Sequence, residues 1–144
     1  MSEADSLAGR LTAGGHELRQ RVYFEDTDFS GRVYHARYLQ FLERGRSDYL
    51  RLLGVHHREL AAAGLAFAVR RVEIDFLRPA QIDDVLLVTT RALVVRGARI
   101  ILDQAISIRG ESLLQAAVTV AMIGPAQRAV RLPTAVREAF AAVS

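Results

Sequence analysis

Asp26, Asp28, Gly31 and His35 lie within ten consecutive residues of the sequence. An alternating polar and apolar segment precedes them and a long amphipathic segment follows, so an acidic loop is predicted to connect a strand to a helix N-terminus. The first turn of a helix leaves backbone N–H groups unpaired at the positive end of the helix dipole. Such groups polarise a carbonyl oxygen while a nearby carboxylate attacks the carbonyl carbon or activates water. The pattern therefore indicates acyl transfer.

Spacing alone leaves two roles for Asp28: a catalytic carboxylate, or a helix cap or turn residue. Asp26 is expected instead to fix the loop through hydrogen bonds to backbone N–H groups. Gly31 is expected to permit a positive φ or the close approach of an acyl chain. For His35, the backbone N–H is expected to be more important for function than the imidazole ring. No second histidine lies four positions away, so a metal site with the two aspartates has no support.

The remaining candidates each have a second, structural interpretation. Tyr34 either lines a pocket or packs against the helix start. Glu43 either contacts substrate or, as favoured, pairs with an arginine, and His56-His57 are expected in an exposed loop. Four arginines are candidates for binding the phosphates of a nucleotide-tailed ligand, although a plain surface role fits each equally well. They are Arg70, Arg71, Arg96 and Arg99.

Composition excludes several kinds of site. The chain has no cysteine and all 19 basic residues are arginine, so disulfides, thiolate catalysis and lysine Schiff bases are ruled out. The net charge is only +3 and no dense basic block occurs, which does not favour nucleic-acid binding. No apolar run approaches the roughly 20 residues of a membrane span. The polar, acidic start does not resemble a signal peptide. We expect a cytoplasmic protein without a cofactor.

Hydrophobic periodicity predicts the elements that position these residues, within a single domain at 1–144 whose residues 1–15 form a flexible tail. They are strands at 17–25, 66–77, 85–95, 100–108 and 113–123, a helix at 36–53 ended by Gly54, and a short helix at 133–140. Short connections between the later strands indicate antiparallel neighbours. One helix covers only one face of a curved sheet of about five strands, so we expect a homodimer or homotetramer.

The segment from Tyr23 to Leu39, with its run Asp-Thr-Asp-Phe-Ser-Gly-Arg-Val-Tyr-His, resembles the hotdog-fold acyl-CoA thioesterases, as does the following Phe-Leu-Glu-Arg-Gly-Arg at 41–46. Within that family the likeness is to the 4-hydroxybenzoyl-CoA thioesterase type and its Tol-Pal-associated branch. The resemblance implies an α+β hotdog fold in which a curved antiparallel sheet wraps a long helix. It also implies that Asp28 is catalytic and that the backbone N–H of His35, seven positions later, binds the thioester oxygen.

The combined expectation is hydrolysis of an acyl-CoA thioester to the free acid and coenzyme A. Asp28 either attacks the carbonyl carbon or activates water, and both routes remain open. A non-catalytic protein that binds acyl-CoA or acyl carrier protein is the alternative. A hotdog dehydratase is less favoured, because the motif that pairs a histidine with an acid in that class is absent. The sequence does not indicate the length of the acyl group or whether it is aromatic or aliphatic.

Overall fold

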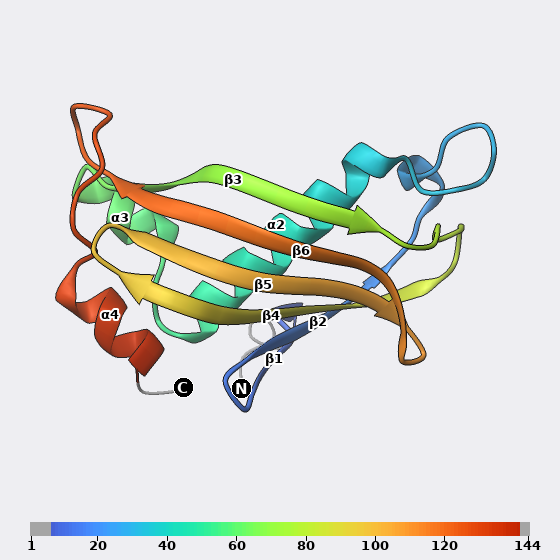
Figure 1. The fold of residues 1–144 in the computed structure, drawn as a ribbon, viewed down its shortest axis with the longest axis horizontal. Coiled ribbons are helices and arrows are strands. Elements are labelled where there is room, and N and C mark those ends of the chain that lie inside the picture. The colour runs from blue at the N-terminus through green and yellow to red at the C-terminus, as the bar shows by residue number, and fades with distance from the viewer. Residues whose placement is uncertain (1–6, 142–144) are drawn as a thin grey trace.

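A long helix and a curved antiparallel sheet make up most of residues 7–141, the part of the chain that the computed structural model describes (Figure 1). The strands are β1 (Arg10–Thr12), β2 (Gly15–Arg21), β3 (Ala66–Phe76), β4 (Val85–Arg96), β5 (Arg99–Ile108) and β6 (Glu111–Ile123). The helices are the 3-10 turn η1 (Phe24–Asp26), α2 (His35–Leu52), α3 (His57–Ala62) and α4 (Thr134–Ala141). The predicted α+β class is confirmed. No helix within residues 7–141 is long and apolar enough to cross a membrane.

The six strands pair in the order β1-β2-β4-β5-β6-β3, and every pair is antiparallel. Tight turns join β4 to β5 and β5 to β6, as predicted from the short connections. Consecutive strands β3 and β4 are not neighbours, because β3 pairs with β6 instead. The chain therefore crosses from one side of the sheet to the other between Phe76 and Val85. This crossing passes beside the acidic loop, where Val33 N donates to Ala80 O at 2.9 Å.

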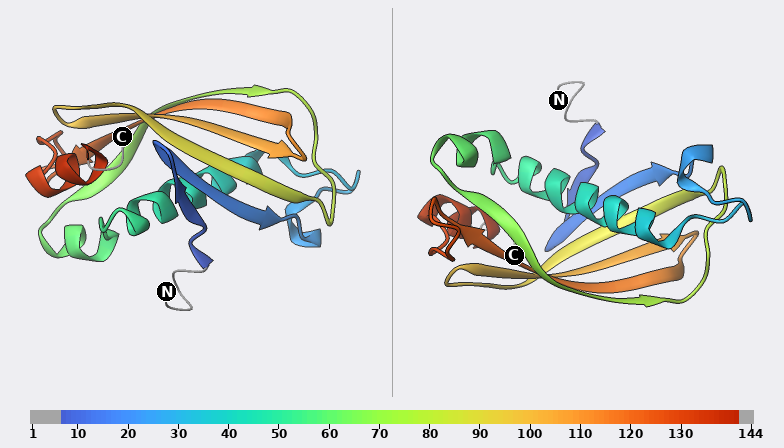
Figure 2. Two further views of the ribbon diagram at one scale, coloured as in Figure 1. Left: turned by 90° about the horizontal axis from the view of Figure 1, so that it is seen from below. Right: turned by 90° about the horizontal axis from the view of Figure 1, so that it is seen from above.

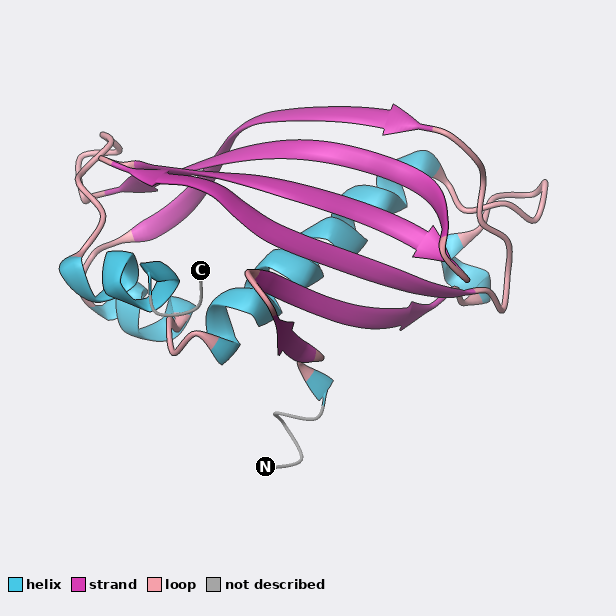
Figure 3. Ribbon diagram, turned by 60° about the horizontal axis from the view of Figure 1, so that its bottom comes forward, coloured by secondary structure: helices cyan, strands magenta, loops and turns pink. Residues whose placement is uncertain are grey.

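Helix α2 covers one face of the sheet, as Figures 2 and 3 show from three directions. Its apolar residues recur at helical spacing, so one side of the helix is buried against the strands. The buried residues are Tyr38, Phe41, Leu42, Gly45, Tyr49 and Leu50. The helix ends just before Gly54, whose φ of +85° is the left-handed conformation that commonly follows a helix. The predicted helix at 36–53 is thus confirmed within one residue at each end.

Gly45 allows α2 to approach the sheet closely. A Cβ atom there would lie 2.9 Å from Val88 Cγ1 and 3.2 Å from Thr90 Oγ1. Beside it, the buried amide of Gln104 donates from Nε2 to Leu42 O at 3.0 Å and to Thr90 Oγ1 at 2.9 Å. The buried Gln104 side chain therefore links a backbone carbonyl of α2 to Thr90 of β4 beside Gly45, where the helix and the sheet pack closely.

The first predicted strand was too long, because the chain leaves the sheet after Arg21. Phe24, which lies within the predicted strand at 17–25, belongs to η1 instead and is 80% exposed. The Asp26 carboxylate accepts a hydrogen bond from Tyr23 N at 2.8 Å, which stabilises the turn over an extended strand.

The predicted flexible tail was also wrong in part. Within it, β1 pairs with the start of β2, and Ala8 is buried with its carbonyl 2.6 Å from His16 Nε2. Residues 1–6 of that tail lie outside the described part of the chain.

Sequence periodicity missed α3 because it has only six residues. His57, expected in a loop, is its first residue, and its ring packs edge-on against Phe67 of β3 with centroids 6.1 Å apart. His56 is exposed as expected.

Candidate functional site

The acidic loop is a small hairpin. Thr27 pairs with Val33, Asp28 N donates to Arg32 O at 2.9 Å, and Gly31 N donates to Asp28 O at 3.0 Å. Gly31 has a φ of +81°, a conformation that strains residues with a Cβ atom. A Cβ atom there would meet nothing within 4 Å. Of the two roles expected for Gly31, the positive φ is therefore the one that this structure requires.

The Asp28 carboxylate is exposed and has a free oxygen. Its Oδ1 accepts hydrogen bonds from the Ser30 amide at 2.8 Å and from the Ser30 hydroxyl at 2.5 Å. Oδ2 accepts no hydrogen bond of normal geometry from residues 7–141, although the Arg32 backbone N–H is near enough to the carboxylate to favour its charged form. The hydrogen bond from the Ser30 hydroxyl, followed by that from the Ser30 amide, lowers the pKa of Asp28 below its ordinary value. The carboxylate is therefore ionised at neutral pH, with one oxygen available for chemistry.

Asp26 has the structural role expected from the sequence. Its side chain is 4% exposed, accepts from Tyr23 N at 2.8 Å and lies 3.4 Å from the Arg37 guanidinium. Arg37 also donates to Glu25 O at 3.2 Å, while Tyr34 N donates to Asp26 O at 3.0 Å. These contacts bind both ends of the loop to the first turn of α2.

His35 is the first residue of α2, and its backbone N–H donates to no acceptor within residues 7–141. This is the expected state of an amide in the first turn of a helix, where the dipole adds partial positive charge. The imidazole stacks on Tyr34 with centroids 5.3 Å apart and meets Phe76 edge-on at 6.0 Å. The two aromatic contacts hold the ring in place, and the backbone N–H remains available as a donor.

Asp28 and His35 line one open pocket of about 600 Å³. Its floor includes the buried Tyr38, whose hydroxyl oxygen accepts from Ala80 N at 2.9 Å and so connects α2 to the crossing between β3 and β4. The other lining residues are Ser30, Arg32, Val33, Phe76, Leu77, Arg78 and Pro79. An ionised carboxylate and a helix N-terminus thus lie on one partly apolar wall.

The pocket also contains two arginines that sequence reasoning missed. Arg32 belongs to the hairpin and Arg78 to the crossing, and Arg78 forms an ion pair with Glu111. The bridge between Arg32 and Gln81 brings these two segments together. The Arg-Pro pair at 78 and 79 marked the end of a strand without indicating its distance from Asp28.

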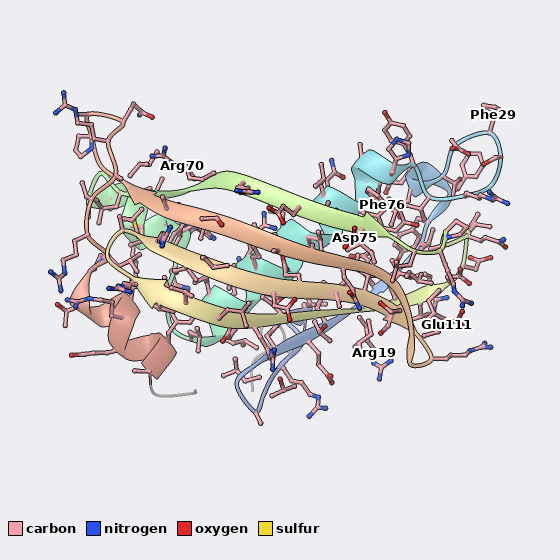
Figure 4. All side chains as sticks on the ribbon, in the orientation of Figure 1. Arg19, Phe29, Arg70, Asp75, Phe76 and Glu111 are labelled. Atoms are coloured by element: carbon pink, nitrogen blue, oxygen red, sulfur yellow. The ribbon has the colours of Figure 1, made fainter. Side chains whose placement is uncertain are left out.

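Several predicted site residues lie elsewhere in the chain. Tyr34 is 54% exposed and stacks on His35, and the described residues that line the Asp28 pocket do not include it. Glu43 lines a second cavity farther along α2. In Figure 4 Arg70 is far from Phe29, the residue that follows Asp28. All four candidate arginines are exposed, and Arg96 faces Arg99 across the β4–β5 turn. Within one chain these arginines do not surround Asp28.

No group of three or more histidine, aspartate or glutamate side chains within residues 7–141 is arranged to hold a metal ion. Arg70 is the extra residue of a β-bulge, since Val69 and Arg71 pair with adjacent residues of β6. The simple alternation that would place Arg70 and Arg71 on opposite faces is therefore interrupted at this point.

Comparison with known proteins gives consistent matches. Residues 22–140 match the family described as the Thioesterase-like superfamily. The acyl-CoA thioesterase YbgC of Haemophilus influenzae is 41% identical over 128 residues, which are 88% of this chain and 94% of that protein. A probable thioesterase from Bartonella henselae has 46% identity and a TM-score of 0.79, covering 83% of this chain and 99% of its own. Slr0204 from Synechocystis, a 1,4-dihydroxy-2-naphthoyl-CoA thioesterase, has 26% identity and a TM-score of 0.83, covering 89% and 96%.

Proposed function

We propose that this chain, which belongs to the Thioesterase-like superfamily, hydrolyses acyl-CoA thioesters to a free acid and coenzyme A. The family and the hotdog fold predicted from the sequence are confirmed by these matches. The observation that carries the proposal is that one pocket is lined by both Asp28, an ionised carboxylate, and His35, whose backbone N–H is unpaired within residues 7–141. The names of the relatives support a coenzyme A ester as the substrate.

In the proposed reaction the thioester oxygen accepts a hydrogen bond from the His35 N–H. The charge that develops on this oxygen is stabilised by the helix dipole, so the carbonyl carbon becomes more electrophilic. Asp28 Oδ2 then attacks that carbon to form a mixed anhydride, or removes a proton from a water molecule that attacks instead. In both routes the carbon–sulfur bond breaks and the electron pair leaves with the thiolate of coenzyme A. In the first route water then cleaves the mixed anhydride, which releases the free acid and regenerates the Asp28 carboxylate.

Both routes start from the ionised carboxylate, the form that the lowered pKa of Asp28 maintains at neutral pH. Rapid-quench experiments with a radiolabelled acyl group distinguish the two routes. Attack by Asp28 predicts label that is transiently bound to the protein and absent from Asp28→Asn. If the burst of product appears with no protein-bound label, water is the nucleophile.

We further propose that two chains form one working unit through β3. This strand has 11 residues, pairs within the described residues 7–141 along its β6 side alone, and exposes Val69, Val72 and Phe76. An unpaired edge of this length and apolarity readily pairs with another strand. Antiparallel pairing of β3 with its copy places the beginning of one β3 beside the end of the other.

This arrangement gives the surface arginines a role. Arg70 and Arg71 lie at the middle of β3, while Phe76 lies at its end in the Asp28 pocket. If the two copies of β3 pair in a register that places Arg70 of one opposite Phe76 of the other, these arginines of the partner subunit lie beside the Asp28 pocket of the first. We propose that these arginines bind the phosphates of coenzyme A together with Arg32 and Arg78. Arg96 and Arg99 remain candidates for the same role, and Gly31, Tyr34 and Glu43 remain candidates for substrate contact.

The second candidate function is a hotdog protein that binds acyl-CoA, or an acyl group on a carrier protein, without hydrolysis. The free oxygen of Asp28 favours hydrolysis. Release of free thiol from short, long and aromatic acyl-CoA esters, followed with a thiol-reactive dye, decides between the two. Thiol release that is lost in Asp28→Asn is expected. Binding of the esters without thiol release would contradict the proposal. The cytoplasmic location also stays a prediction, which cell fractionation tests.

A further inference from the structure

A second cavity, of about 250 Å³, is lined by residues from the later turns of α2, from the sheet and from helices α3 and α4. Its wall is largely apolar, with Leu50, Phe67, Ile100, Leu102, Val120 and Phe140 among its residues. Apolar walls with a few polar groups are typical of sites for small organic ligands. The polar side chains that line it include Glu43 and Arg46 of α2.

Arg46 is a half-buried cation with little to neutralise it. Its Nη1 donates to Gln104 Oε1 at 3.1 Å, and no carboxylate within residues 7–141 lies within 4.0 Å of it. Burial lowers the pKa of the guanidinium while the charge of Glu43 raises it. An arginine side chain nevertheless stays charged in proteins, and it has five N–H donors. Most of these donors, and the positive charge, are therefore available at the cavity wall.

Gln104 holds this guanidinium in place. The Gln104 side chain is 1% exposed, and its Nε2 already donates to Leu42 O and Thr90 Oγ1. These two bonds fix the orientation of the amide, so Oε1 is directed at Arg46. Arg44, two residues earlier in the same helix, is exposed and reaches Gln20 on the opposite side. The position of Arg46 at the cavity is thus determined by buried hydrogen bonds.

We propose that this cavity is a second ligand site, which binds a carboxylate on a short apolar stem. The carboxylate accepts hydrogen bonds from the free N–H groups of Arg46, and the stem packs against Leu50, Ile100 and Leu102. A half-buried guanidinium without an ion pair favours an anion, since a buried charge is stable only when it is paired. Guanidinium and carboxylate are also complementary in geometry. Glu43 faces the same cavity but is exposed, so solvent screens its repulsion of the ligand.

The ligand has two possible sources, which rest on the proposed function. It is either the free acid that thioester hydrolysis releases, or the far end of an acyl group that carries a second carboxylate. Both present the same chemistry to Arg46. The second source requires the acyl group to reach the cavity from an Asp28 pocket, which a β3-paired dimer would allow.

Equilibrium titration of the full chain with hexanoate and benzoate tests the site, with hexanol and benzyl alcohol as neutral controls. The acids should bind more tightly than the alcohols. Arg46→Met should weaken acid binding by about tenfold or more, the effect of losing a hydrogen bond to a charged group. The matched control Arg44→Met, on the exposed side of α2, should leave binding unchanged. Glu43→Gln should tighten it, because a like charge is removed.

Equal affinity for acids and alcohols, or unchanged acid binding in Arg46→Met, would overturn the proposal. A measurement on the unmodified protein covers the case in which Arg46→Met does not fold. Nuclear Overhauser effects from hexanoate to the methyl groups of Leu50, Ile100 and Leu102 are expected, and their absence at saturating hexanoate refutes the site.

Kinetics with two esters distinguish the sources. If the ligand is the released acid, Arg46→Met raises the inhibition constant of hexanoate and leaves the ratio of kcat/KM for adipoyl-CoA and hexanoyl-CoA unchanged. If it is the far end of the acyl group, that ratio falls by about tenfold. Should neither ester be hydrolysed, the proposed function fails, while the titrations still decide whether the site exists.

Discussion

Replacing Asp28 by asparagine should remove catalysis and preserve the fold. The side chain is exposed, and only its Oδ1 accepts hydrogen bonds, both from Ser30. An asparagine oxygen accepts the same bonds, so Tm should change by less than about 2 °C. An amide neither attacks a thioester nor removes a proton from water at neutral pH. We therefore expect kcat to fall by about 100-fold or more.

Asp26→Asn is the matched control two residues away. Asp26 is buried, accepts from Tyr23 N at 2.8 Å and lies 3.4 Å from the guanidinium of Arg37. Asparagine keeps an acceptor oxygen but loses the charge in both contacts, which should cost about 1–3 kcal/mol of stability. For a domain of this size that lowers Tm by roughly 3–9 °C. The turnover of the folded protein should fall only in part, since Asp28, the carboxylate proposed to act on the thioester, is intact.

Thermal unfolding by circular dichroism and initial rates of thiol release measure the two effects separately. Asp28→Asn should change the rate alone, and Asp26→Asn should mainly change the stability. Turnover close to that of the unmodified protein in Asp28→Asn would refute the assignment. If Asp26→Asn lowers kcat more than Asp28→Asn does, the roles of the two aspartates are reversed.

Four further outcomes are expected. Because the pKa of Asp28 is lowered, the acid limb of kcat/KM should lie below about pH 4, and a limb at pH 6–7 would indicate a histidine. Light scattering at micromolar concentration should give at least two chains, so a fully active monomer would contradict β3 pairing. KM for acyl-CoA, but not for acyl-pantetheine, should rise with ionic strength. Single alanine changes of the arginines proposed to bind phosphate should raise KM without lowering kcat. If KM is unchanged in the salt titration and in every variant, these arginines do not bind the coenzyme. Those arginines are Arg32, Arg70, Arg71, Arg78, Arg96 and Arg99. Burial lowers the pKa of His16, so below about pH 6.5 the unfolded chain binds a proton on this imidazole that the folded chain does not, and stability falls. His16→Gln should therefore flatten the decline of Tm between about pH 6.5 and 5. An unaltered slope would show that His16 does not cause the decline.

Local sequence patterns predicted the elements whose residues repeat over many turns or strand positions. Helix α2 has six buried residues at helical spacing, and Gly54 marks its end, so its limits were predicted within one residue. The end of β2 could not be read in this way. Phe24 continues the alternation, but the hydrogen bond from Tyr23 N to the Asp26 side chain stabilises a turn at that point.

Hydrophobic periodicity could not predict which strands pair when they are not consecutive in the sequence. Nothing in the alternation of β3 indicates that it pairs with β6 rather than with β4, the next strand in the chain. The neighbourhood of Asp28 depends on this topology, because the crossing from β3 to β4 brings Arg78 into the pocket. Sequence spacing therefore pointed to Asp28 and His35, which line one pocket, but missed Arg32 and Arg78, which line the same pocket.

Gly45 also determines where the helix N-terminus lies. Only glycine fits at position 45, since a Cβ atom there would lie 2.9 Å from Val88 Cγ1. A shift of α2 by one turn, about 5.4 Å, would bring Phe41 or Tyr49 to this position and is sterically blocked. The helix therefore has one allowed position along the sheet. His35 is ten residues away, about 15 Å along the helix axis, so a hydrogen in place of a side chain at Gly45 sets where the His35 N–H, and the loop bound to it, lie relative to the sheet.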